Sequence, residues 1–572
     1  MANISKLHRE ELLGKISEIR KFIEKSSRDE NSSNLLHYLN EIAKDVKGKK
    51  YGLVFEEHRE SIDEKLETHI PVLVEDEKLF IDNGGEQNFL IEGDNLAALK
   101  LLEKTHKGMI DVIYIDPPYN TGKNEKQDFH YDDNFVDIND TFRHSKWLSF
   151  MDKRLKLAKN LLKKNGVLFI SIGDDEQSNL EQLCNCIFGE TNKIENYIWE
   201  STFRPDNSSP ILRRNAEFVL CYARNKSQIK SFKGVVSKSE GMPSLTKGKE
   251  KIKVISFPAN TVHTLLPDGK YKKGLKDNGK ELRWELLNDV VVKDGMIKSK
   301  IELKGHSYWA TEKKIQEELR QGTEIWIKSE SFVPYYKKTK DSIVRPNKIL
   351  NQDKVNDYIF SNAELANILG KQIFNNPKPT TLISFLSDFT DNKNALILDF
   401  FAGSGTTGHA VLNLNAEDKG RRKFILCTNN ENNICRDITY QRMKTVIAGK
   451  RKDKSKYSDG LPGSLKYFRI DYVPISEKLY YEYADELLLH VRELVELENG
   501  INFNNNSEIA IILTDEEMAE FVENNKKKKN LEVKKIYYGH NVLLSNAQIS
   551  FLKKHNIKLN VIPDYYYQEL EK

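Results

Sequence analysis

A short apolar run that ends in two consecutive prolines constrains this chain more than any other feature. The run Ile110–Ile115 is rich in β-branched residues and apolar on both faces, which predicts a strand of a parallel sheet that is covered on both sides. Asp116, Pro117, Pro118, Tyr119 and Asn120 follow at once. Because proline fixes φ and cannot continue a helix, the chain must leave the strand in an extended conformation. This segment is therefore expected at the carboxyl edge of the sheet, where α/β proteins bind ligands.

Strand and helix patterns alternate around this run. Residues 89–94 (FLIEGD) predict a strand and residues 96–102 a helix. A longer helix is expected around Trp147, Phe150, Met151, Leu155, Leu161 and Leu162, and we expect Gly166 to end it. Two further strands follow in VLFISIGDDE and EFVLCYAR, the second at residues 217–224.

A second strand and helix alternation begins near residue 361. It includes the strand patterns ALILDF and RRKFILCTNN, which flank a glycine-rich loop and a helix. This order matches the first half of a doubly wound sheet. The fold class is therefore predicted to be α/β.

Composition and pattern changes divide the chain into five expected parts. Apolar residues recur at helical spacing near the N-terminus, for example Leu12 and Ile16, then Leu35 and Leu39, and predict two amphipathic helices. These helices are expected to form a lid or a dimer element, with a direct DNA contact as the alternative. The run Lys526–Lys529 is expected in a solvated loop, with a nucleic-acid clamp as the alternative. The parts are an N-terminal helical region (1–84), an α/β half (85–225), an insert (226–360), a second α/β half (361–471) and a small α/β domain (472–572).

The composition excludes several classes of protein. The 572 residues are 39% hydrophobic and 30% charged, without a membrane-spanning run, and the first residues do not resemble a secretory signal. We therefore expect a cytoplasmic protein. Five scattered cysteines do not form a disulfide framework, and Cys184 and Cys186 are expected to be buried free thiols rather than metal ligands. The net charge of +4 permits a polyanionic partner without indicating one.

The Asp116–Tyr119 segment carries groups that suit chemistry on an aromatic amino group. Such a nitrogen is a weak nucleophile because its lone pair is conjugated into the ring. Acceptors at Asp116 and the Pro117 carbonyl could bind both amino hydrogens and direct the lone pair at an incoming methyl group, while Tyr119 offers a surface for stacking a flipped base. The alternative is a rigid turn without chemistry.

A second motif, DFFAGSGTTGHA at residues 399–410, forms a glycine turn before a helix. Gly403 and Gly405 permit close approach of the backbone to a ligand, and Thr406 begins the helix. The spacing is neither GxGxxG nor a phosphate loop that ends in Gly-Lys-Ser/Thr. It suits an adenosyl ligand whose methionine part lies against the loop; the alternative is an unrelated strand-to-helix turn.

Together, and in this order, the two motifs resemble the β class of DNA amino-methyltransferases. DPPYNTG followed by HYDDNF, then NPKPTTLISFLSDF and LPGSLKYF, resemble the modification subunits of type III restriction-modification systems over residues 85–470. The resemblance implies a Rossmann-like S-adenosylmethionine-dependent methyltransferase sheet, and a catalytic group made of Asp116, Pro117, Pro118 and Tyr119. It implies cofactor contacts from Asp94, Lys378, Thr380, Asp399, Phe401, Gly403, Gly405, Thr406 and, at a position that departs from the family pattern, Glu431 as the ribose ligand.

The insert is where such enzymes read DNA. The residues expected to contact DNA are Trp309, Trp326, Tyr335, Tyr336, Lys337 and Lys338, which interleave aromatic and basic side chains. The alternative for each of them is a small β-rich core with a solvated rim. The leading Asp of the tetrapeptide favours adenine over cytosine as the target base.

The resemblance also implies partners. These are double-stranded DNA, a second copy of the chain, and a restriction (Res) helicase-nuclease subunit, with no membrane and no metal in this chain. A competing hypothesis makes the chain chiefly a sequence-reading scaffold for a nuclease, and a third makes RNA or protein the methyl acceptor.

Overall fold

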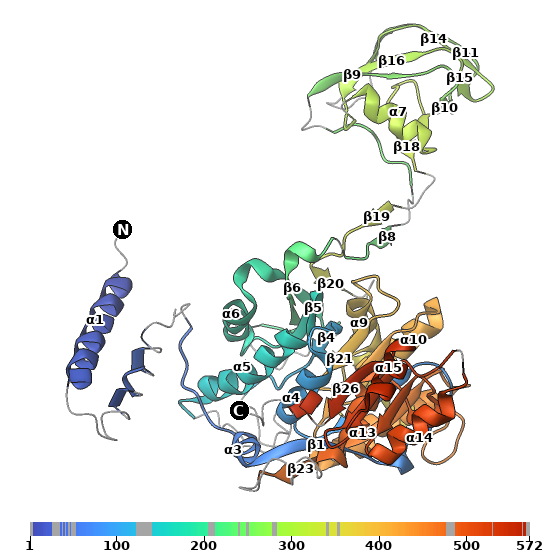
Figure 1. Cartoon of the computed structure of the whole chain (residues 1–572). Helices are drawn as coiled ribbons and strands as arrows, with labels where there is room; N and C mark the ends of the chain where they lie inside the picture. The colour runs from blue at the N-terminus through green and yellow to red at the C-terminus, as the bar shows by residue number, and fades with distance from the viewer. Residues whose placement is uncertain are drawn as a thin grey trace. The chain divides into compact units, whose positions relative to one another are not determined.

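A computed structural model gives the arrangement of the helices and strands (Figure 1). It describes residues 4–25, 53–121, 140–203, 212–230, 232–237, 241–247, 251–276, 283–309, 311–338, 342–351, 355–475, 487–528, 530–562 and 564–567, with shorter pieces between 35 and 46. The HYDDNF segment and Lys529 lie outside the described residues. In the N-terminal region, α1 spans Ile4–Lys25, and the described residues between 35 and 46 are helical.

The chain divides into two compact units. The main unit comprises residues 1–230 and 348–572, and the inserted unit comprises residues 231–347. The inserted unit is shorter than the expected insert (226–360), because β20 (Ile349–Leu350) pairs with β6 (Lys193–Glu200) of the main sheet. No helix among the described residues is long and apolar enough to cross a membrane.

The main unit is built on a mixed sheet with the strand order β1-β23-β3-β22-β21-β4-β5-β7-β6-β20. All of these strands run in one direction except β1 and β7, which are antiparallel to their neighbours. The bounds are β1 His69–Glu75, β3 Gln87–Glu92, β4 Ile110–Ile115, β5 Leu162–Ile172, β7 Ala216–Ala223, β21 Leu396–Asp399, β22 Lys423–Thr428 and β23 Ser464–Pro474. The strands β3, β4 and β5 come from the first half of the chain. The strands β21 and β22, which flank the glycine loop, come from the second half and lie between β3 and β4, as a Rossmann-like fold requires.

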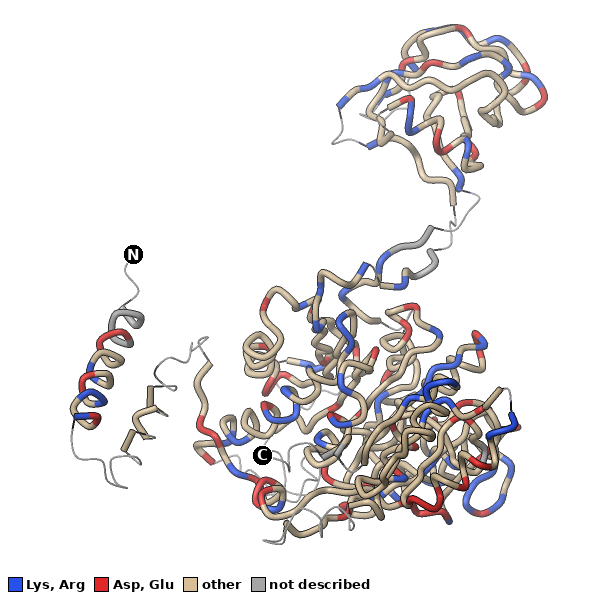
Figure 2. The backbone as a smooth tube through the Cα atoms, in the orientation of Figure 1, with Lys and Arg blue, Asp and Glu red and all other residues tan. Residues whose placement is uncertain are grey.

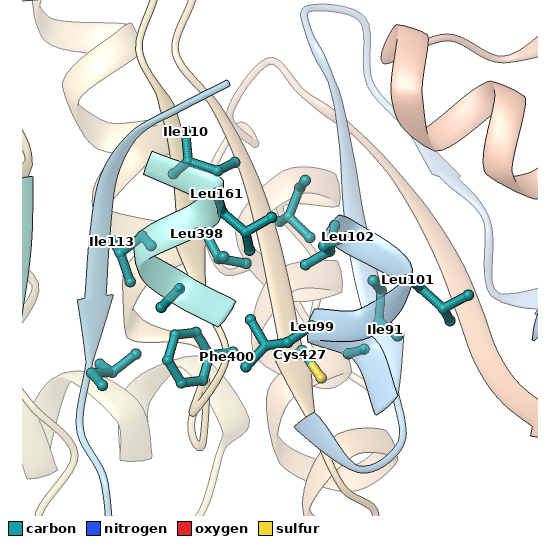
Figure 3. Close-up of a cluster of buried hydrophobic side chains, with 14 of the residues drawn as sticks. Ile91, Leu99, Leu101, Leu102, Ile110, Ile113, Leu161, Leu398, Phe400 and Cys427 are labelled. Atoms are coloured by element: carbon teal, nitrogen blue, oxygen red, sulfur yellow. The ribbon is translucent and has the colours of Figure 1, made fainter. Parts of the chain in front are cut away.

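Helices cover both faces of this sheet. On one face α4 (Asn95–His106) packs against α5 (Arg143–Leu161), and α5 packs against α6 (Gln177–Phe188). On the other face α10 (Thr406–Asp418) packs against α9 (Thr380–Ser387) and α11 (Tyr440–Ala448), and α11 also contacts α8 (Tyr358–Leu369). Successive side chains of β22 point to opposite faces of the sheet. Cys427 packs with Leu99 and Leu102 on the α4 side (Figure 3), while Leu426 contacts α10 at Gly408.

The expected elements near the two motifs are present, with two corrections. The prediction that Gly166 ends the long helix is wrong, because α5 ends at Leu161 and Gly166 lies inside β5, at a register shift opposite β4. A Cβ at Gly166 would meet the Ile110 carbonyl oxygen at 2.9 Å, so the glycine is explained by this close approach. The prediction that Cys186 is buried is also wrong: Cys184 faces the core, and Cys186, two residues along α6, is exposed.

The C-terminal region carries its own parallel sheet, β24 (Ile509–Ile512), β25 (Lys535–Gly539) and β26 (Lys558–Ile562). It has a small core around Met518 and Ile536, beneath α14 (Asp515–Asn525) and α15 (Asn546–Lys554). The helix α13 (Val491–Asn499) packs on α4 and β1 and contributes Leu494 to the main core. The region is therefore anchored in the main unit.

The inserted unit is rich in β-structure. It contains a six-stranded sheet in the order β11-β14-β15-β10-β17-β18, a four-stranded sheet in the order β12-β13-β16-β9, and the helix α7 (Glu312–Arg320). The bounds are β9 Ile252–Phe257, β10 Val262–Thr264, β11 Gly269–Tyr271, β12 Gly274–Lys276, β13 Trp284–Leu286, β14 Val290–Lys293, β15 Met296–Ile297, β16 Ile301–His306, β17 Glu324–Ile327 and β18 Pro334–Lys337. A core of its own lies around Trp284, Leu303 and Ile325. Basic and acidic residues are both scattered over its backbone (Figure 2).

Candidate active site

A cavity of about 480 Å³ opens at the carboxyl ends of β4, β21 and β22. The two sequence motifs meet there, although they are almost 300 residues apart in the chain. Of the residues expected at the site, the cavity is lined by Asp116, Pro117, Pro118, Tyr119, Lys378, Asp399, Phe401, Gly403 and Thr406. β21 lies directly beside β4, with Ile397 opposite Val112, so sheet register places the two loops side by side.

Buried polar side chains fix the proline-containing loop after β4. The indole Nε1 of Trp147, which is fully buried in α5, donates a hydrogen bond to the Pro118 carbonyl at 2.7 Å. Asn120 adopts a left-handed conformation with φ 55°, and its amide donates to Glu176. The buried Glu176 carboxylate also lies 2.7 Å from His144 Nδ1 and accepts from Asn179 at 2.8 Å. The loop is thus held in one conformation by groups on α5 and α6, which leaves the Pro117 carbonyl free of these contacts.

Tyr119 is fixed at both ends of its side chain. Its ring lies against Gly173, where an added Cβ would come within 2.9 Å of the ring carbon Cδ2. Its hydroxyl donates to Glu217 Oε2 at 2.7 Å. A second tyrosine of the cavity wall, Tyr358, donates to the same oxygen at 2.9 Å. The pKa of both phenols is raised well above the ordinary value by burial and by nearby carboxylates, so both hydroxyls keep their protons.

Asp116 is paired through one oxygen only. Its Oδ2 accepts a hydrogen bond from Lys378 Nζ at 2.8 Å. Its Oδ1 is buried and has no hydrogen-bond partner among the residues that the structure describes. Since a buried acceptor without a donor is costly, this oxygen is suited to receive a donor from a ligand in the cavity.

The glycine loop is shaped by Asp399 and by residues of α11. The backbone N–H of Phe401 donates to Asp399 Oδ1 at 3.0 Å, and the Thr407 hydroxyl donates to Oδ2 at 2.5 Å. Burial raises the pKa of Asp399 to about 7, and the negative charge of Asp116 adds to this. Gly403 (φ 49°) and Gly405 (φ 75°) occupy the left-handed region, which a side chain would disfavour.

A buried arginine, Arg442, donates hydrogen bonds that fix the end of the glycine loop. Arg442 donates to the Thr406 hydroxyl at 2.8 Å and to Glu364 Oε2 at 3.1 Å. Thr380, which was expected to bind the cofactor, instead donates to the other oxygen of Glu364 at 2.7 Å. Through these bonds α8, α9 and α11 are tied to the start of α10.

Three other residues expected at the cofactor do not line the cavity either. Asp94 caps α4 by accepting from Leu96 N at 2.7 Å and lies 3.6 Å from Arg154. Gly405 forms the N-cap of α10, and Glu431 lies in the short helix Glu431–Asn433 after β22. The cavity wall at the end of β22 is formed by Thr428 and Asn429 instead.

In the inserted unit, the residues expected to contact DNA differ in exposure. Trp309 is only 3% exposed and belongs to the core, as the alternative interpretation of the sequence predicted, so it is not available for contact with DNA. The rings of Trp326 and His263 stack at 4.8 Å, and Lys328 lies over the Tyr335 ring at 4.3 Å. Tyr336 packs against Trp309, Lys337 is exposed, and Lys338 lies 3.8 Å from Glu318.

Sequence reasoning missed several side chains that shape the cavity, namely Trp147, Glu176, Glu217, Tyr358, Glu364 and Arg442. One signal was available for Glu217, which is the single charged residue in the apolar strand pattern AEFVLCYA. A carboxylate in a buried strand requires a partner, and that requirement predicts a polar site. The partners themselves are 98, 141 and 161 positions away and could not be assigned from local patterns.

The fold and the cavity define a Rossmann-like α/β protein with a ligand site at the carboxyl edge of its sheet. The family model described as DNA methylase (N6_N4_Mtase) matches residues 110–441, which include both loops of the cavity. The chain therefore belongs to the DNA methylase family.

Three relatives show how far the likeness extends. The Mod subunit of the type III restriction-modification enzyme StyLTI of Salmonella typhimurium is 30% identical over 63% of this chain and 56% of its own length. The EcoPI Mod subunit of Escherichia phage P1 is 30% identical over 61% of this chain and 58% of its own length. The type II methyltransferase M.KpnI of Klebsiella pneumoniae is 30% identical over 67% of this chain and 90% of its own length. The chain thus spans slightly more than half the length of the two Mod subunits.

Proposed function

We propose that this chain transfers a methyl group from S-adenosylmethionine to the N6 amino group of an adenine in double-stranded DNA. The observation that carries the proposal is the meeting of Asp116 and Asp399 in one cavity, at the ends of neighbouring strands. Family membership supports methyl transfer to DNA. The geometry supports an amino group as the group that receives the methyl, because the free oxygen of an ionised Asp116 accepts hydrogen bonds and donates none, and an amino group can donate to it.

The cofactor half of the cavity fits S-adenosylmethionine. Asp399 presents a carboxylate for the ammonium group of the methionine part, and Phe401 presents an aromatic surface for the adenosyl part. Gly403 brings the loop backbone close without a side chain in the way. When bound, S-adenosylmethionine supplies an electrophilic methyl group on a sulfonium. We assign Asp399, Phe401, Gly403 and Thr406 to this half.

The base half of the cavity fits a flipped adenine. The Tyr119 ring provides the stacking surface, and Asp116 Oδ1 and the Pro117 carbonyl accept the two hydrogens of the amino group. These hydrogen bonds orient the nitrogen lone pair away from the ring plane, which prepares it for the methyl group. The protein therefore contributes positioning and electrostatics, and Asp116 stabilises the positive charge that develops on the nitrogen.

Partners and target recognition form a second part of the proposal. The relatives named as Mod subunits of type III restriction-modification enzymes support a role as the modification and sequence-reading subunit, with a Res subunit as partner. A second copy of the chain is proposed as a further partner. In the inserted unit, the exposed Lys337 and the partly buried Trp326, Tyr335, Tyr336 and Lys338 are proposed to read DNA. The proposed location is the cytoplasm, where the DNA is found.

Methyl incorporation into DNA by the purified chain tests the proposal. Wild-type protein should transfer labelled methyl groups to duplex DNA, and nucleoside analysis should identify the product as N6-methyladenine. Tyr119→Ala should lower the rate about 10- to 100-fold, because stacking on an aromatic ring is worth about 1–3 kcal/mol per base, while binding of DNA is retained. Methylation of cytosine, or of RNA or protein in preference to duplex DNA, would overturn the assignment.

A further inference from the structure

One carboxylate of the cavity has no part in the mechanism proposed above. Glu217 lies at the start of β7, and β7 runs antiparallel to β5, with Phe218 opposite Ile172. The start of β7 therefore lies at the carboxyl edge of the parallel strands. Glu217 lines the same cavity as Asp116 and Tyr119, and its side chain is only 16% exposed.

Three donors converge on a single oxygen of Glu217. Oε2 accepts from the Tyr119 hydroxyl at 2.7 Å and from the Tyr358 hydroxyl at 2.9 Å, and it lies 3.7 Å from Lys378 Nζ. We call these four residues, together with Asp116, the Glu217 cluster. Asp116 and Tyr119 follow β4, Glu217 lies at the start of β7, Tyr358 begins α8 and Lys378 precedes α9. The cluster therefore joins four elements around one side of the cavity.

Lys378 lies between two carboxylates. Its Nζ is 2.8 Å from Asp116 Oδ2 and 3.7 Å from Glu217 Oε2, and it lies 5.0 and 5.3 Å from the centres of the Tyr119 and Tyr358 rings. Burial by itself lowers the pKa of Lys378, but the two carboxylates outweigh burial and raise it above the ordinary value. The residue is therefore a cation with two anionic neighbours and two aromatic faces.

We propose that Glu217 is a positioning residue that keeps Lys378 on one oxygen of Asp116 and so reserves the other oxygen for the amino group of the target base. This inference rests on the proposed function and assigns Lys378 to the base half of the cavity instead of the cofactor half. An ammonium group with a single carboxylate partner can bridge both of its oxygens. With a second carboxylate on its other side, Lys378 stays at Oδ2, and Oδ1 keeps a free acceptor position.

The same contacts orient the stacking surface. Because one carboxylate oxygen accepts both phenol hydroxyls, the positions of Tyr119 and Tyr358 depend on each other. Gly173 fixes the Tyr119 ring from the side. Loss of the charge at Glu217 would weaken two buried hydrogen bonds and release the ring from one of its two fixed points.

The cluster also favours a particular class of base. Two carboxylates and one ammonium leave a net charge of −1 in a buried site, and the free position is an acceptor. An exocyclic amino group can donate to it, whereas an exocyclic carbonyl oxygen would place two acceptors against each other. The arrangement therefore selects amino-bearing bases before any chemistry occurs.

The test compares Glu217→Gln with a matched control in the full-length protein. Glu195→Gln is the control, because Glu195 lies on the neighbouring strand β6, is paired with Lys348 at 3.0 Å and does not line the cavity. For Glu217→Gln we expect kcat for DNA methylation to fall about 10- to 100-fold, which corresponds to the loss of charged hydrogen bonds. The KM for S-adenosylmethionine should stay within about twofold, and Glu195→Gln should match wild type.

A double-mutant cycle with Tyr119→Phe separates positioning from a general structural effect. Tyr119→Phe keeps the stacking ring and removes the hydroxyl, so part of the Glu217→Gln defect should already be present in it, and the double variant should lose less than the product of the two single losses. A Glu217→Gln variant with normal kcat, or with a defect that lies in the KM for S-adenosylmethionine, would overturn the inference.

A measurement without methyl transfer keeps the inference separate from the proposed function. Loss of one carboxylate should lower the pKa of Lys378, so an amine-specific acylating reagent at pH 9 should modify Lys378 faster in Glu217→Gln than in wild type, as quantified by peptide mass spectrometry. Equal labelling rates would refute the role of Glu217 in holding Lys378. If wild-type protein methylates no DNA, the proposed function fails, and the labelling result still decides whether Glu217 controls Lys378.

Discussion

The three carboxylates of the cavity, Asp116, Glu217 and Asp399, differ in the groups that donate hydrogen bonds to them. Asp116 is held by an ammonium, Glu217 by two phenols and that same ammonium, and Asp399 by a backbone N–H and a hydroxyl. Only Asp399 has neutral partners throughout, and it is the carboxylate for which burial raises the pKa to about 7. Its charge state should therefore change within the physiological pH range.

This shift predicts a pH dependence of cofactor binding. If the Asp399 carboxylate binds the ammonium of S-adenosylmethionine, only its ionised form contributes, so affinity should rise about eightfold from pH 6 to pH 7.5 for a group with a pKa of about 7. Isothermal titration calorimetry below pH 8, where the ligand keeps its ammonium, measures this rise. Asp399→Asn should bind more weakly at pH 7.5 and lose the slope. The same slope in Asp399→Asn would show that another group is responsible.

At the scale of elements, the local sequence pattern was sufficient to predict the strands that are buried on both faces. Ile110–Ile115 and Leu396–Asp399 are covered on both faces, so their apolar runs identified them, and the residues that follow each strand mark the sheet edge. Strand pairing could not be predicted in the same way. That β7 runs antiparallel beside β5, and so brings Glu217 to the cavity, depends on contacts between distant segments.

All four residues predicted for the base line the cavity, whereas several of those predicted for the cofactor do not. Thr380 and Asp94 precede or begin helices, and their side chains are used there for a hydrogen bond to Glu364 and for a helix cap. Both tasks depend on which element lies opposite, which the sequence does not specify. Trp309 was similarly ambiguous, because an aromatic residue between lysines suits a DNA surface and a small core equally well, and its burial decided the question.

The attachment of α13 to the main sheet depends on a buried charge cluster with an excess of acid. Lys466 Nζ on β23 donates hydrogen bonds to Glu75 Oε2 on β1 at 2.8 Å and to Glu496 Oε2 on α13 at 2.6 Å. Glu493, one turn before Glu496, lies in the same surroundings, and burial together with these carboxylates raises its pKa to about 7. The site therefore contains one ammonium group, that of Lys466, and three carboxyl groups, those of Glu75, Glu493 and Glu496.

The sign of this shift predicts how stability varies with pH. The folded-state pKa of Glu493 lies above its ordinary value of 4.5, so the stability that this group supplies is complete below pH 4.5 and is lost as pH rises through about 7. At pH 8, Glu493→Gln should therefore be more stable than wild type by about 1–3 kcal/mol, and the difference should disappear near pH 4.5. Thermal denaturation at the two pH values tests this. The exposed Glu520→Gln on α14 is the control, and a stabilisation that is independent of pH would contradict the assignment.

At the scale of the whole molecule, the chain combines a cavity in its main unit with a separately packed insertion. Among the residues that the structure describes, those that line the cavity belong to the main unit, and the buried core of the inserted unit is formed by residues between 245 and 333. M.KpnI is matched over 90% of its length, whereas the two Mod subunits are matched over slightly more than half.

This division predicts that the inserted unit can be removed without loss of S-adenosylmethionine binding. The two connections to the inserted unit pair with each other, β8 (Val235–Ser237) with β19 (Ser342–Val344), and Val236 lies opposite Ile343. Because antiparallel partners are only about 5 Å apart, residues 237–342 can be replaced by the two-residue turn Asn-Gly. The shortened protein should unfold cooperatively and bind S-adenosylmethionine with the affinity of the full chain.

Its behaviour toward DNA should change sharply. If the inserted unit reads the sequence, affinity for the target site should fall by about three orders of magnitude, to the level of non-specific binding, and site-specific methylation should be lost. Fluorescence anisotropy with target and scrambled duplexes at one fixed salt concentration measures the difference. Since the described residues that line the cavity all belong to the main unit, retained cofactor binding with lost discrimination would assign recognition to residues 231–347. Continued preference for the target duplex would place sequence reading in the main unit instead.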